Sequence, residues 1–483
     1  MADRSHQPRR PPAARKEAEE MRGAERADGR GGKAEVEARD GVQRRHPARA
    51  ELDEDDRQEQ GGEGDQHTHG RGSLAGRRGG EYPENGIGGS PVAARRPRDH
   101  APDFAAPWVA RGAPAVYRSR AAALGCCPPL SLTLETPMTR KTLGNSDISV
   151  SAICLGTMTW GSQTDEAGGH AQMDMALDHG VDFWDTAEMY PVNPVLAETV
   201  GNTEAIIGSW FAARGRRADV VLATKIAGKG GKARGGEEIS PASIRRALEG
   251  SLTRLRTDYV DLYQFHWPNR GSYHFRQIWG FDASRQDRAA TLQHMQDCLG
   301  TLGELKAEGK IRAFGLSNES AWGMAQWLRL AEAGAGPRPL ALQNEYSLLC
   351  RLYDGDLAEL GVNEQVTLLA YSPLATGLLT GKYAPDITPE GSRRAGTPEL
   401  GGRITPRVWD AVAAYVDLAR VQGLDPVQMA VAWVMGRPFP VVPIIGATTE
   451  AQLARVLGAA DLVLAPDLRT AIDRIHKAHP MPY

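Results

Sequence analysis

The chain has 483 residues, of which 41% are hydrophobic and 24% charged, and its formal net charge is −3. This near-neutral balance gives no reason to expect nucleic acid or an anionic membrane as a partner. No apolar run approaches the roughly 18–20 residues of a transmembrane helix, and no secretory signal is visible. Five cysteines without a CxxC pair suit a reducing compartment, so we expect a cytoplasmic protein.

Residues 1–137 differ in composition from the rest of the chain. They are crowded with Arg, Gly, Ala, Pro, Glu and Asp, and large aliphatic residues are scarce before Leu130. Such a segment cannot bury enough apolar surface to offset a backbone ordering cost of about 1–2 kcal/mol per residue, so we expect a disordered extension. A regularly patterned chain starts at Met138, which we interpret as the natural initiator. Abundant peptides from residues 1–130 in mass spectra of the native protein would contradict this interpretation.

From residue 138 to residue 483 strand-like and helix-like segments alternate. Ser240 and Asp425, each followed by proline, are start signals of helices. Eight strand–helix pairs without a run of hairpin turns favour a (β/α)8 TIM barrel over an open sheet. The predicted strands are 152–156, 181–185, 220–225, 261–266, 311–316, 340–344, 366–371 and 440–445. The predicted helices are 166–179, 198–214, 241–256, 289–308, 319–333, 354–362, 407–435, 449–460 and 466–478, and 375–406 is a long rim loop.

Three of the predicted strands end on polar residues. The second strand ends at Asp185, in a turn that also carries Tyr190, and the next two end at Lys225 and His266. In a barrel of parallel strands this spacing places all three strand ends at the same carboxyl-terminal rim. Each residue alone also has a structural interpretation, as a member of an ion pair, a satisfied histidine or a packing tyrosine.

The motifs of residues 138–483, taken together, resemble the aldo-keto reductase family. Details within 188–192 and 433–438 are similar to the bacterial Tas-type members. Each motif is modest, but the ordered set is specific; it covers essentially all of 138–483 and none of 1–137. In chain order the motifs are Gly156-Thr-Met-Thr-Trp-Gly161, Asp185-Thr-Ala-Glu-Met-Tyr190, Ala223-Thr-Lys225, His266-Trp-Pro268, Gly315-Leu-Ser-Asn318, Gln343-Asn-Glu-Tyr-Ser347, Tyr371-Ser-Pro373, Gly381-Lys-Tyr383 and Ile444-Ile-Gly-Ala-Thr448.

The resemblance implies hydride transfer from NADPH to the carbonyl of a small substrate, with a tyrosine as the proton donor. Tyr190 is then the general acid, and Lys225 lowers the phenol pKa from its usual value of about 10. Asp185 supplies the countercharge of Lys225, and His266, as neutral imidazole, orients the carbonyl oxygen. Their joint occurrence at consecutive strand ends favours this interpretation over four separate structural roles.

Further strand ends carry side chains that suit the donor and acceptor of a nicotinamide carboxamide. Ser317, Asn318 and Gln343 match the family's positions, and Tyr371 would stack on the ring. A helix N-cap is the alternative role of Asn318. Barrels commonly bind phosphate with the loops after strands seven and eight and a helix amino terminus. The remaining cofactor contacts implied by the resemblance are Gly156, Thr157, Ser372, Leu374, Gly377, Gly381, Lys382, Gly446, Thr448 and Gln452.

The last helix departs from the family pattern. Many members hold adenine there with an acidic residue followed by Asn, whereas this chain has Arg455 and Val456. Val456 cannot bond the base. Arg455 is either a contact to the 2′-phosphate, which would favour NADPH, or an exposed helix arginine.

A second dinucleotide motif, GxGxxA, is formally present at 228–233. A Rossmann site needs a helix that opens at once, but here the helix cap comes only at Ser240. We therefore interpret this segment as a mobile loop at the rim.

Met158, Trp160 and Trp267 are predicted to wall the substrate pocket. Apolar walls with few polar groups suit aldehydes and ketones broadly, rather than one highly hydrated sugar. The insert 269–288 contains Tyr273, Phe275, Trp279 and Phe281. These aromatic residues either shape the pocket mouth or serve packing.

An alternative function is that of a regulatory subunit that binds NADPH with little turnover, like the aldo-keto-like β-subunits of potassium channels. The four candidate catalytic residues do not separate the two functions. A metal-dependent hydrolase is disfavoured, and no metal is expected, because the rim strands show no clustered ligand spacing. The physiological substrate and the oligomeric state do not follow from the sequence.

Overall fold

Eight parallel strands close into a barrel in the computed structural model, which describes residues 138–483. Neighbouring strands pair in chain order, and the last strand, β10, pairs with β3, so the predicted (β/α)8 fold is confirmed. The predicted extension 1–137 lies outside the described residues. The barrel strands are β3 (Cys154–Gly156), β4 (Phe183–Asp185), β5 (Val221–Ile226), β6 (Val260–Phe265), β7 (Ile311–Ser317), β8 (Pro339–Glu345), β9 (Thr367–Tyr371) and β10 (Val441–Ile445).

A short hairpin, β1 (Arg140–Thr142) with β2 (Ser149–Ser151), covers the amino-terminal end of the barrel. In its turn Gly144 N donates to Thr367 Oγ1 at the start of β9, at 2.8 Å. The sequence analysis missed this hairpin, because strands of three residues give too short an alternation to detect. The hairpin side chains join the apolar lumen cluster, which comprises Leu143, Ile148, Val150, Cys154, Phe183, Ala223, Leu262, Ala313, Ala341, Leu369, Val442 and Ile444.

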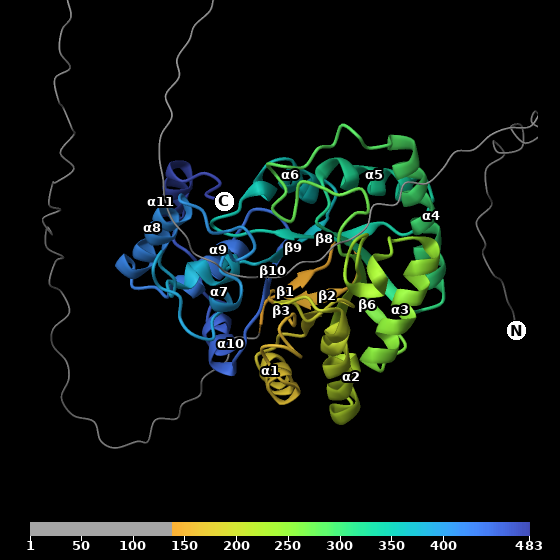
Figure 1. Cartoon of the computed structure of the whole chain (residues 1–483), viewed down its shortest axis with the longest axis horizontal. Coiled ribbons are helices and arrows are strands. Elements are labelled where there is room, and N and C mark those ends of the chain that lie inside the picture. The colour runs from red at the N-terminus through yellow and green to blue at the C-terminus, as the bar shows by residue number, and fades with distance from the viewer. Residues whose placement is uncertain (1–137) are drawn as a thin grey trace, which may run out of the picture. The chain divides into compact units, whose positions relative to one another are not determined.

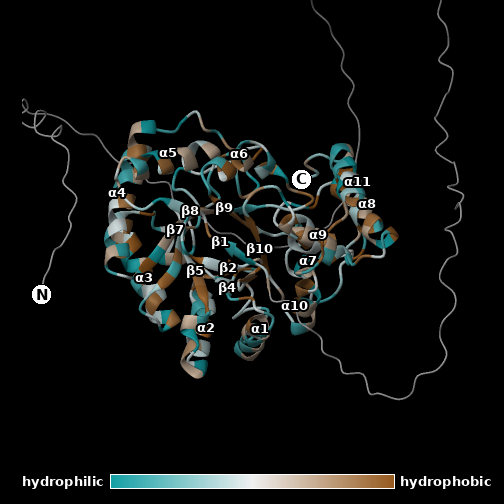
Figure 2. Ribbon diagram, turned by 180° about the vertical axis from the view of Figure 1, so that it is seen from behind, coloured by the Kyte–Doolittle hydropathy of each residue, from teal (hydrophilic) through white to brown (hydrophobic). Residues whose placement is uncertain are grey.

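Helices surround the barrel (Figure 1), and hydrophobic and hydrophilic residues both occur along them (Figure 2). A capping box joins Ser240 and Ser243, and Asp425 caps a second helix. Between residues 138 and 483 no helix is long and apolar enough to cross a membrane. The helices are α1 (Glu166–Asp178), α2 (Asn202–Arg214), α3 (Pro241–Leu255), α4 (Arg288–Ala307), α5 (Ala321–Glu332), α6 (Asp356–Asn363), α7 (Arg393–Gly396), α8 (Val408–Val421), α9 (Pro426–Met435), α10 (Glu450–Leu457) and α11 (Pro466–Ala478).

Two predicted segments differ in detail from the structure. The helix expected at 407–435 is two helices, because Gly423 adopts a left-handed φ of 67° and Pro426 begins the next helix. The rim loop 375–406 contains a 3₁₀ turn (Ala375–Thr380) and α7. The segment after β5 contains only a 3₁₀ turn (Ala233–Gly236) before α3, so no helix opens behind the GxGxxA motif and a Rossmann site is excluded there.

A buried carboxylate ties three strands together at the amino-terminal end. Asp261, in β6, accepts hydrogen bonds from Arg217 Nη2 (2.9 Å), Leu222 N (2.9 Å) and Arg312 Nη1 (2.7 Å). Its side chain is 2% exposed, and its loss leaves the buried Leu222 N–H without an acceptor.

We predict that Asp261→Ala lowers the free energy of unfolding by about 1–3 kcal/mol, because the buried Leu222 N–H loses its acceptor and the hydrogen bonds from Arg217 and Arg312 are lost. Urea unfolding followed by circular dichroism measures this change. Asp219→Ala, which removes the partner of the half-exposed Arg216, is the matched control and should change stability little. Equal midpoints for the two variants would contradict the prediction.

Candidate active site

The three polar strand ends lie together at the carboxyl-terminal rim. Asp185 ends β4, Lys225 lies in β5 and His266 follows β6. The pairing register joins Asp185 to Ala223 and Lys225 to Gln264, so neighbouring strands bring these side chains to the same level. All three are buried, with 2%, 0% and 6% exposure respectively. The barrel thus assembles the predicted constellation from three consecutive strands.

Lys225 and Asp185 form a fully enclosed ion pair. Lys225 Nζ lies 2.6 Å from Asp185 Oδ2 and also donates to the main-chain oxygen of Thr186 at 2.8 Å. Asp185 Oδ1 accepts from the amides of Gln264 (3.1 Å) and Gln343 (2.8 Å). Every charge of the pair therefore has hydrogen-bonding partners, which a buried ion pair needs.

Gln264 is a site residue that the sequence analysis missed. It lies two residues before His266, and alternate strand residues point to the same side of a sheet. A lone amide within the apolar strand 260–265 was the available signal.

Tyr190 stands beside this ion pair. Lys225 Nζ lies 5.0 Å from the centre of the Tyr190 ring, and the rings of Tyr190 and His266 meet edge to face at 5.7 Å. The tyrosine is 8% exposed, and its hydroxyl forms no hydrogen bond with another described residue. The phenol proton is therefore available to a bound molecule.

The pKa of Tyr190 differs from the expectation. Burial raises the pKa of the phenol well above its usual value, and the charges of Asp185 and Cys154 raise it further. The predicted net lowering of this pKa is wrong, because the loss of phenolate hydration and the repulsion by the Asp185 carboxylate outweigh any attraction by the Lys225 ammonium. Tyr190 consequently rests in the protonated form.

His266 and Lys225 also have shifted pKa values. Burial lowers the pKa of His266 well below its usual range, and the Lys225 ammonium lowers it further, which supports the predicted neutral imidazole. His266 Nδ1 is buried without a hydrogen-bond partner among residues 138–483. A proton on Nδ1 would be an unsatisfied buried donor, so we assign the proton to Nε2. Burial lowers the pKa of Lys225, although Asp185 opposes this shift.

The predicted nicotinamide residues form one hydrogen-bonded group. Asn318 Nδ2 donates to the His266 main-chain oxygen (2.9 Å) and to Ser317 Oγ (3.1 Å). Ser317 Oγ donates to the main-chain oxygen of Gln343, and Tyr371 donates to Asn318 Oδ1, each at 2.8 Å. The amide oxygen of Gln343 accepts no hydrogen bond from a described residue. This free acceptor suits the N–H donor of a carboxamide, whereas the Ser317 and Tyr371 hydroxyl protons are already donated within the group.

Asn318 is not the N-cap of α5. Ser320 takes that role, with its side chain accepting from Gly323 N. Asn318 instead adopts a left-handed φ of 55°, which asparagine tolerates better than most residues. This conformation leaves its amide free to join the ends of β6, β7 and β9.

Five predicted cofactor residues follow β9, and three of them lie in the rim loop 375–406. Gly377 and Gly381 have φ values of 100° and 76°, where glycine is favoured. Ser372 is also left-handed and Leu374 is half-buried. A Cβ on Gly377 would lie 3.3 Å from Lys382 Cε, so the glycine lets Lys382 lie close across the loop. Lys382 is exposed, and its Nζ lies 5.0 Å from the Tyr383 ring.

The remaining predicted phosphate contacts surround the start of α10. Gly446 is exposed directly after β10, and Thr448 donates to Gln452 Oε1 through both its N and Oγ1, at 3.1 Å each. Arg455 pairs with Asp425 at 2.7 Å, so the structure favours a helix-surface role for this arginine.

Two predicted contacts, Thr157 and Gly156, have structural roles. Thr157 is fully buried and its hydroxyl donates to the Asp185 main-chain oxygen at 2.9 Å, so it supports Asp185 from inside. A Cβ on Gly156 would lie 2.7 Å from Ile444 Cγ2, so this glycine permits close packing of β3 on β10. Val456 is buried and cannot reach a base.

The predicted pocket role of Trp160 is wrong. Its side chain is fully buried in the core, and Nε1 donates to Gln172 Oε1 at 3.3 Å. A Cβ on Gly169 in α1 would lie 3.3 Å from Trp160 Cδ2, so the glycine allows the indole ring to pack closely on this helix. Met158 and Trp267 are half-buried, and Trp267 packs against His266 with ring centres 5.1 Å apart. These two remain the predicted pocket walls.

The aromatic residues of the insert 269–288 divide between the two predicted roles. Phe275 faces the site, with ring centres 6.3 Å from His266, 5.7 Å from Trp267 and 6.5 Å from Tyr371. Tyr273 and Phe281 pack on each other at 4.9 Å, and Trp279 is 72% exposed. One of the four therefore shapes the site.

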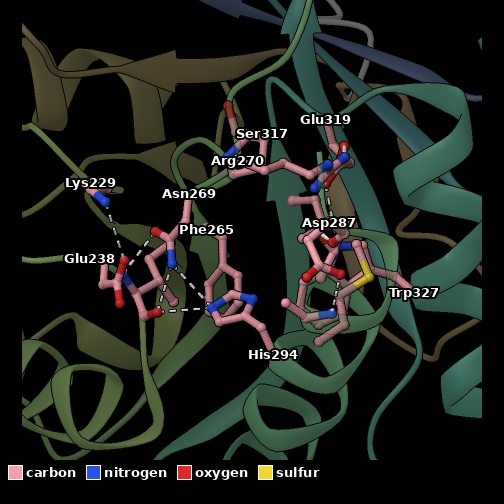
Figure 3. A pocket seen from close by; sticks show the side chains of 16 residues that line it. Lys229, Glu238, Phe265, Asn269, Arg270, Asp287, His294, Ser317, Glu319 and Trp327 are labelled. Atoms are coloured by element: carbon pink, nitrogen blue, oxygen red, sulfur yellow. Dashed lines mark hydrogen bonds and ion pairs between the residues drawn. The ribbon is translucent and has the colours of Figure 1, made fainter. Parts of the chain in front are cut away.

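A separate cavity of about 290 Å³ lies beside the site (Figure 3). None of the four candidate catalytic residues lines it. Its walls come from the outer faces of β6 and β7, from α4 and α5, and from the loops after β5 and β6. In Figure 3 Asn269 contacts His294 and Lys229 pairs with Glu238.

Comparison with known proteins agrees with this geometry. A model of the Aldo/keto reductase family matches residues 152–477. The chain belongs to this family. It is an oxidoreductase of the aldo-keto reductase type, and such enzymes use a nicotinamide cofactor and act on small carbonyl substrates.

Three relatives show where the chain stands in the family. "Protein tas" of Escherichia coli is 42% identical over 344 residues, which cover 70% of this chain and 97% of the relative. A probable voltage-gated potassium channel subunit beta of Arabidopsis thaliana is 29% identical, with coverages of 71% and 98%. Aldo-keto reductase yakc [NADP(+)] of Schizosaccharomyces pombe is 28% identical, with coverages of 69% and 91%. The predicted Tas-type resemblance is confirmed.

We predict that the His266 imidazole stays neutral at pH 6.5, and that Lys225→Met raises its pKa because a neighbouring positive charge is lost. NMR titration of ¹³C-labelled histidine, assigned with a His266→Gln variant, measures both values. A wild-type pKa at or above 6.5, or a pKa that falls in Lys225→Met, would contradict the electrostatic assignment.

Proposed function

We propose that the protein reduces aldehydes and ketones to alcohols with NADPH, and that Tyr190 is the proton donor. The observation that carries this proposal is a protonated phenol with a free hydroxyl, placed between a neutral imidazole and an enclosed ammonium. Bound NADPH supplies the hydride. A carbonyl oxygen between Tyr190 and His266 would then receive a hydrogen bond from each.

In this reaction the Lys225 ammonium offsets only part of the effect of burial on the Tyr190 pKa, so the phenol stays protonated at rest. A neutral phenol remains a proton donor at physiological pH, and an alkoxide is a much stronger base than a phenolate. When the proton leaves, the new phenolate lies near the Lys225 ammonium, whose attraction offsets the cost of a buried negative charge. Lys225 thus acts on the product of proton transfer, and Asp185 and Thr186 keep its Nζ in place.

A preference for NADPH over NADH is part of the proposal. Lys382 is an exposed cation beside the rim loop, and Arg455, the other candidate for a 2′-phosphate, is engaged by Asp425. The relative from Schizosaccharomyces pombe carries NADP(+) in its name. Ser317, Gln343, Tyr371 and Gly446 are the proposed contacts to the rest of the cofactor.

The proposed substrate is a small carbonyl compound with an apolar body. Met158, Trp267 and Phe275 would surround it, and burial of apolar surface would hold it. A cytoplasmic location stays a prediction.

The alternative is a regulatory subunit that binds the cofactor with little turnover. It is favoured only by the name of the channel-subunit relative, whereas the relative from Schizosaccharomyces pombe is named an aldo-keto reductase. A panel of small aldehydes separates the two: tight NADPH binding without NADPH oxidation would support the regulator. Titration with NADPH and NADH in the same buffer tests the cofactor preference.

We predict that Tyr190→Phe lowers kcat for carbonyl reduction by about 10²–10⁴-fold, because the general acid is lost. The Kd for NADPH should stay within a few-fold, since the aromatic ring remains. Stopped-flow NADPH oxidation and fluorescence titration measure the two quantities. Unchanged turnover in this variant would end the assignment of Tyr190.

A further inference from the structure

A second enclosed ion pair lies two residues from the proposed acid. Glu188, in the same turn as Tyr190, is 3% exposed, and its side-chain Oε1 lies 3.0 Å from Arg234 Nη2. Arg234 Nε contacts both carboxylate oxygens at 3.2 Å. Glu188 Oε1 also accepts from Ala227 N at 2.6 Å, and Arg234 Nη2 donates to the Ala227 main-chain oxygen at 2.7 Å. The pair therefore fastens the loop after β5 to the turn that carries Tyr190.

This loop, residues 227–238, contains the GxGxxA motif that does not bind a dinucleotide. Its backbone is held in an unusual shape: Arg234 has a φ of 51°, and Gly230, Gly235 and Gly236 have φ values of 79°, 64° and 82°. Apart from the Arg234 contacts, the loop is held by Gly230 N to Gly236 O at 3.0 Å, by Gly231 N to Gly228 O at 3.3 Å and by the exposed pair of Lys229 with Glu238 at 3.9 Å. Glycines keep wide conformational freedom, so a tether is needed to select one shape.

The loop is folded directly onto Trp267. A Cβ on Gly228 would lie 2.5 Å from Trp267 Cδ1 and Nε1, and one on Gly231 would lie 3.0 Å from Cζ2. Trp267 Nε1 donates to the Lys229 main-chain oxygen at 3.2 Å. Two glycines of the motif are therefore required for close approach to this indole.

Trp267 in turn packs against the rings of His266 and Phe275, at 5.1 and 5.7 Å. A continuous line of contacts leads from the Tyr190 turn through Glu188 and Arg234 to the loop. It continues through Trp267 to His266, whose ring lies 5.7 Å from that of Tyr190.

We propose that Glu188 and Arg234 are positioning residues: their ion pair closes the glycine-rich loop 227–238 on Trp267 and so sets the wall of the carbonyl pocket. This role rests on the proposed function for its catalytic consequence, but the closure of the loop does not. The GxGxxA motif is thereby explained as a loop that covers an indole.

The test compares Arg234→Met with the wild type. Methionine keeps apolar bulk but leaves the buried Glu188 carboxylate without its cation, so the loop should open. Amide hydrogen exchange in peptides that cover 227–238 should become about tenfold faster. The KM for a small aldehyde should rise about tenfold, with kcat and the Kd for NADPH within about threefold.

Two further variants sharpen the comparison. Arg246→Met removes an exposed ion pair to Glu237 in the same loop and is the matched control; it should leave exchange and KM unchanged. Arg234→Lys keeps the charge but loses the paired contacts to Glu188 and Ala227. Its KM should therefore lie between that of the wild type and that of Arg234→Met. Circular dichroism verifies that each variant is folded.

Unchanged exchange and unchanged KM in folded Arg234→Met would overturn the proposal, as would equal effects of Arg234→Met and Arg246→Met. If none of the aldehydes in the panel supports NADPH oxidation by the wild type, the proposed function fails. Hydrogen exchange by itself then still decides whether the ion pair closes the loop.

Discussion

The enclosed ion pair between Lys225 and Asp185 is the constraint around which this barrel is arranged. Its two side chains are 0% and 3% exposed, and charges so deeply buried are destabilising unless every polar atom is satisfied. Four further residues on the rim form these hydrogen bonds. Lys225 donates to the main-chain oxygen of Thr186, and Gln264 and Gln343 donate to the Asp185 carboxylate. The Thr157 hydroxyl donates to the main-chain oxygen of Asp185. A buried pair is a poor source of stability, so its retention points to chemistry.

Burial decides the resting charge of the groups next to the pair. It raises the pKa of Tyr190 and lowers that of His266, so both are neutral near pH 7. The site thus contains one compensated ion pair and two neutral hydrogen-bonding groups. This arrangement keeps the proton on the donor until a carbonyl oxygen needs it, and it assigns to Lys225 the stabilisation of the phenolate that remains.

Loops around the rim are fastened by ion pairs of their own. Arg234 ties the loop after β5 to Glu188, and Arg270 ties the insert after β6 to Glu319. Each loop brings or covers an aromatic wall, Trp267 in the first case and Phe275 in the second. The barrel therefore fixes the acid–base group through its strands, whereas the substrate walls depend on contacts between loops.

The sequence by itself determined the barrel, most helix limits, the three polar residues at strand ends and Tyr190 in the turn beside them. These features depend on local periodicity, on caps such as Ser240, and on a spacing of one strand–helix unit. It could not show that Trp160 belongs to the core and Trp267 to the pocket wall, because a tryptophan gives the same sequence pattern in either place. Nor could it set the direction of the Tyr190 pKa or find the partner of Arg234. Desolvation and ion pairing depend on distances between residues far apart in the chain, and only the closed barrel establishes those distances.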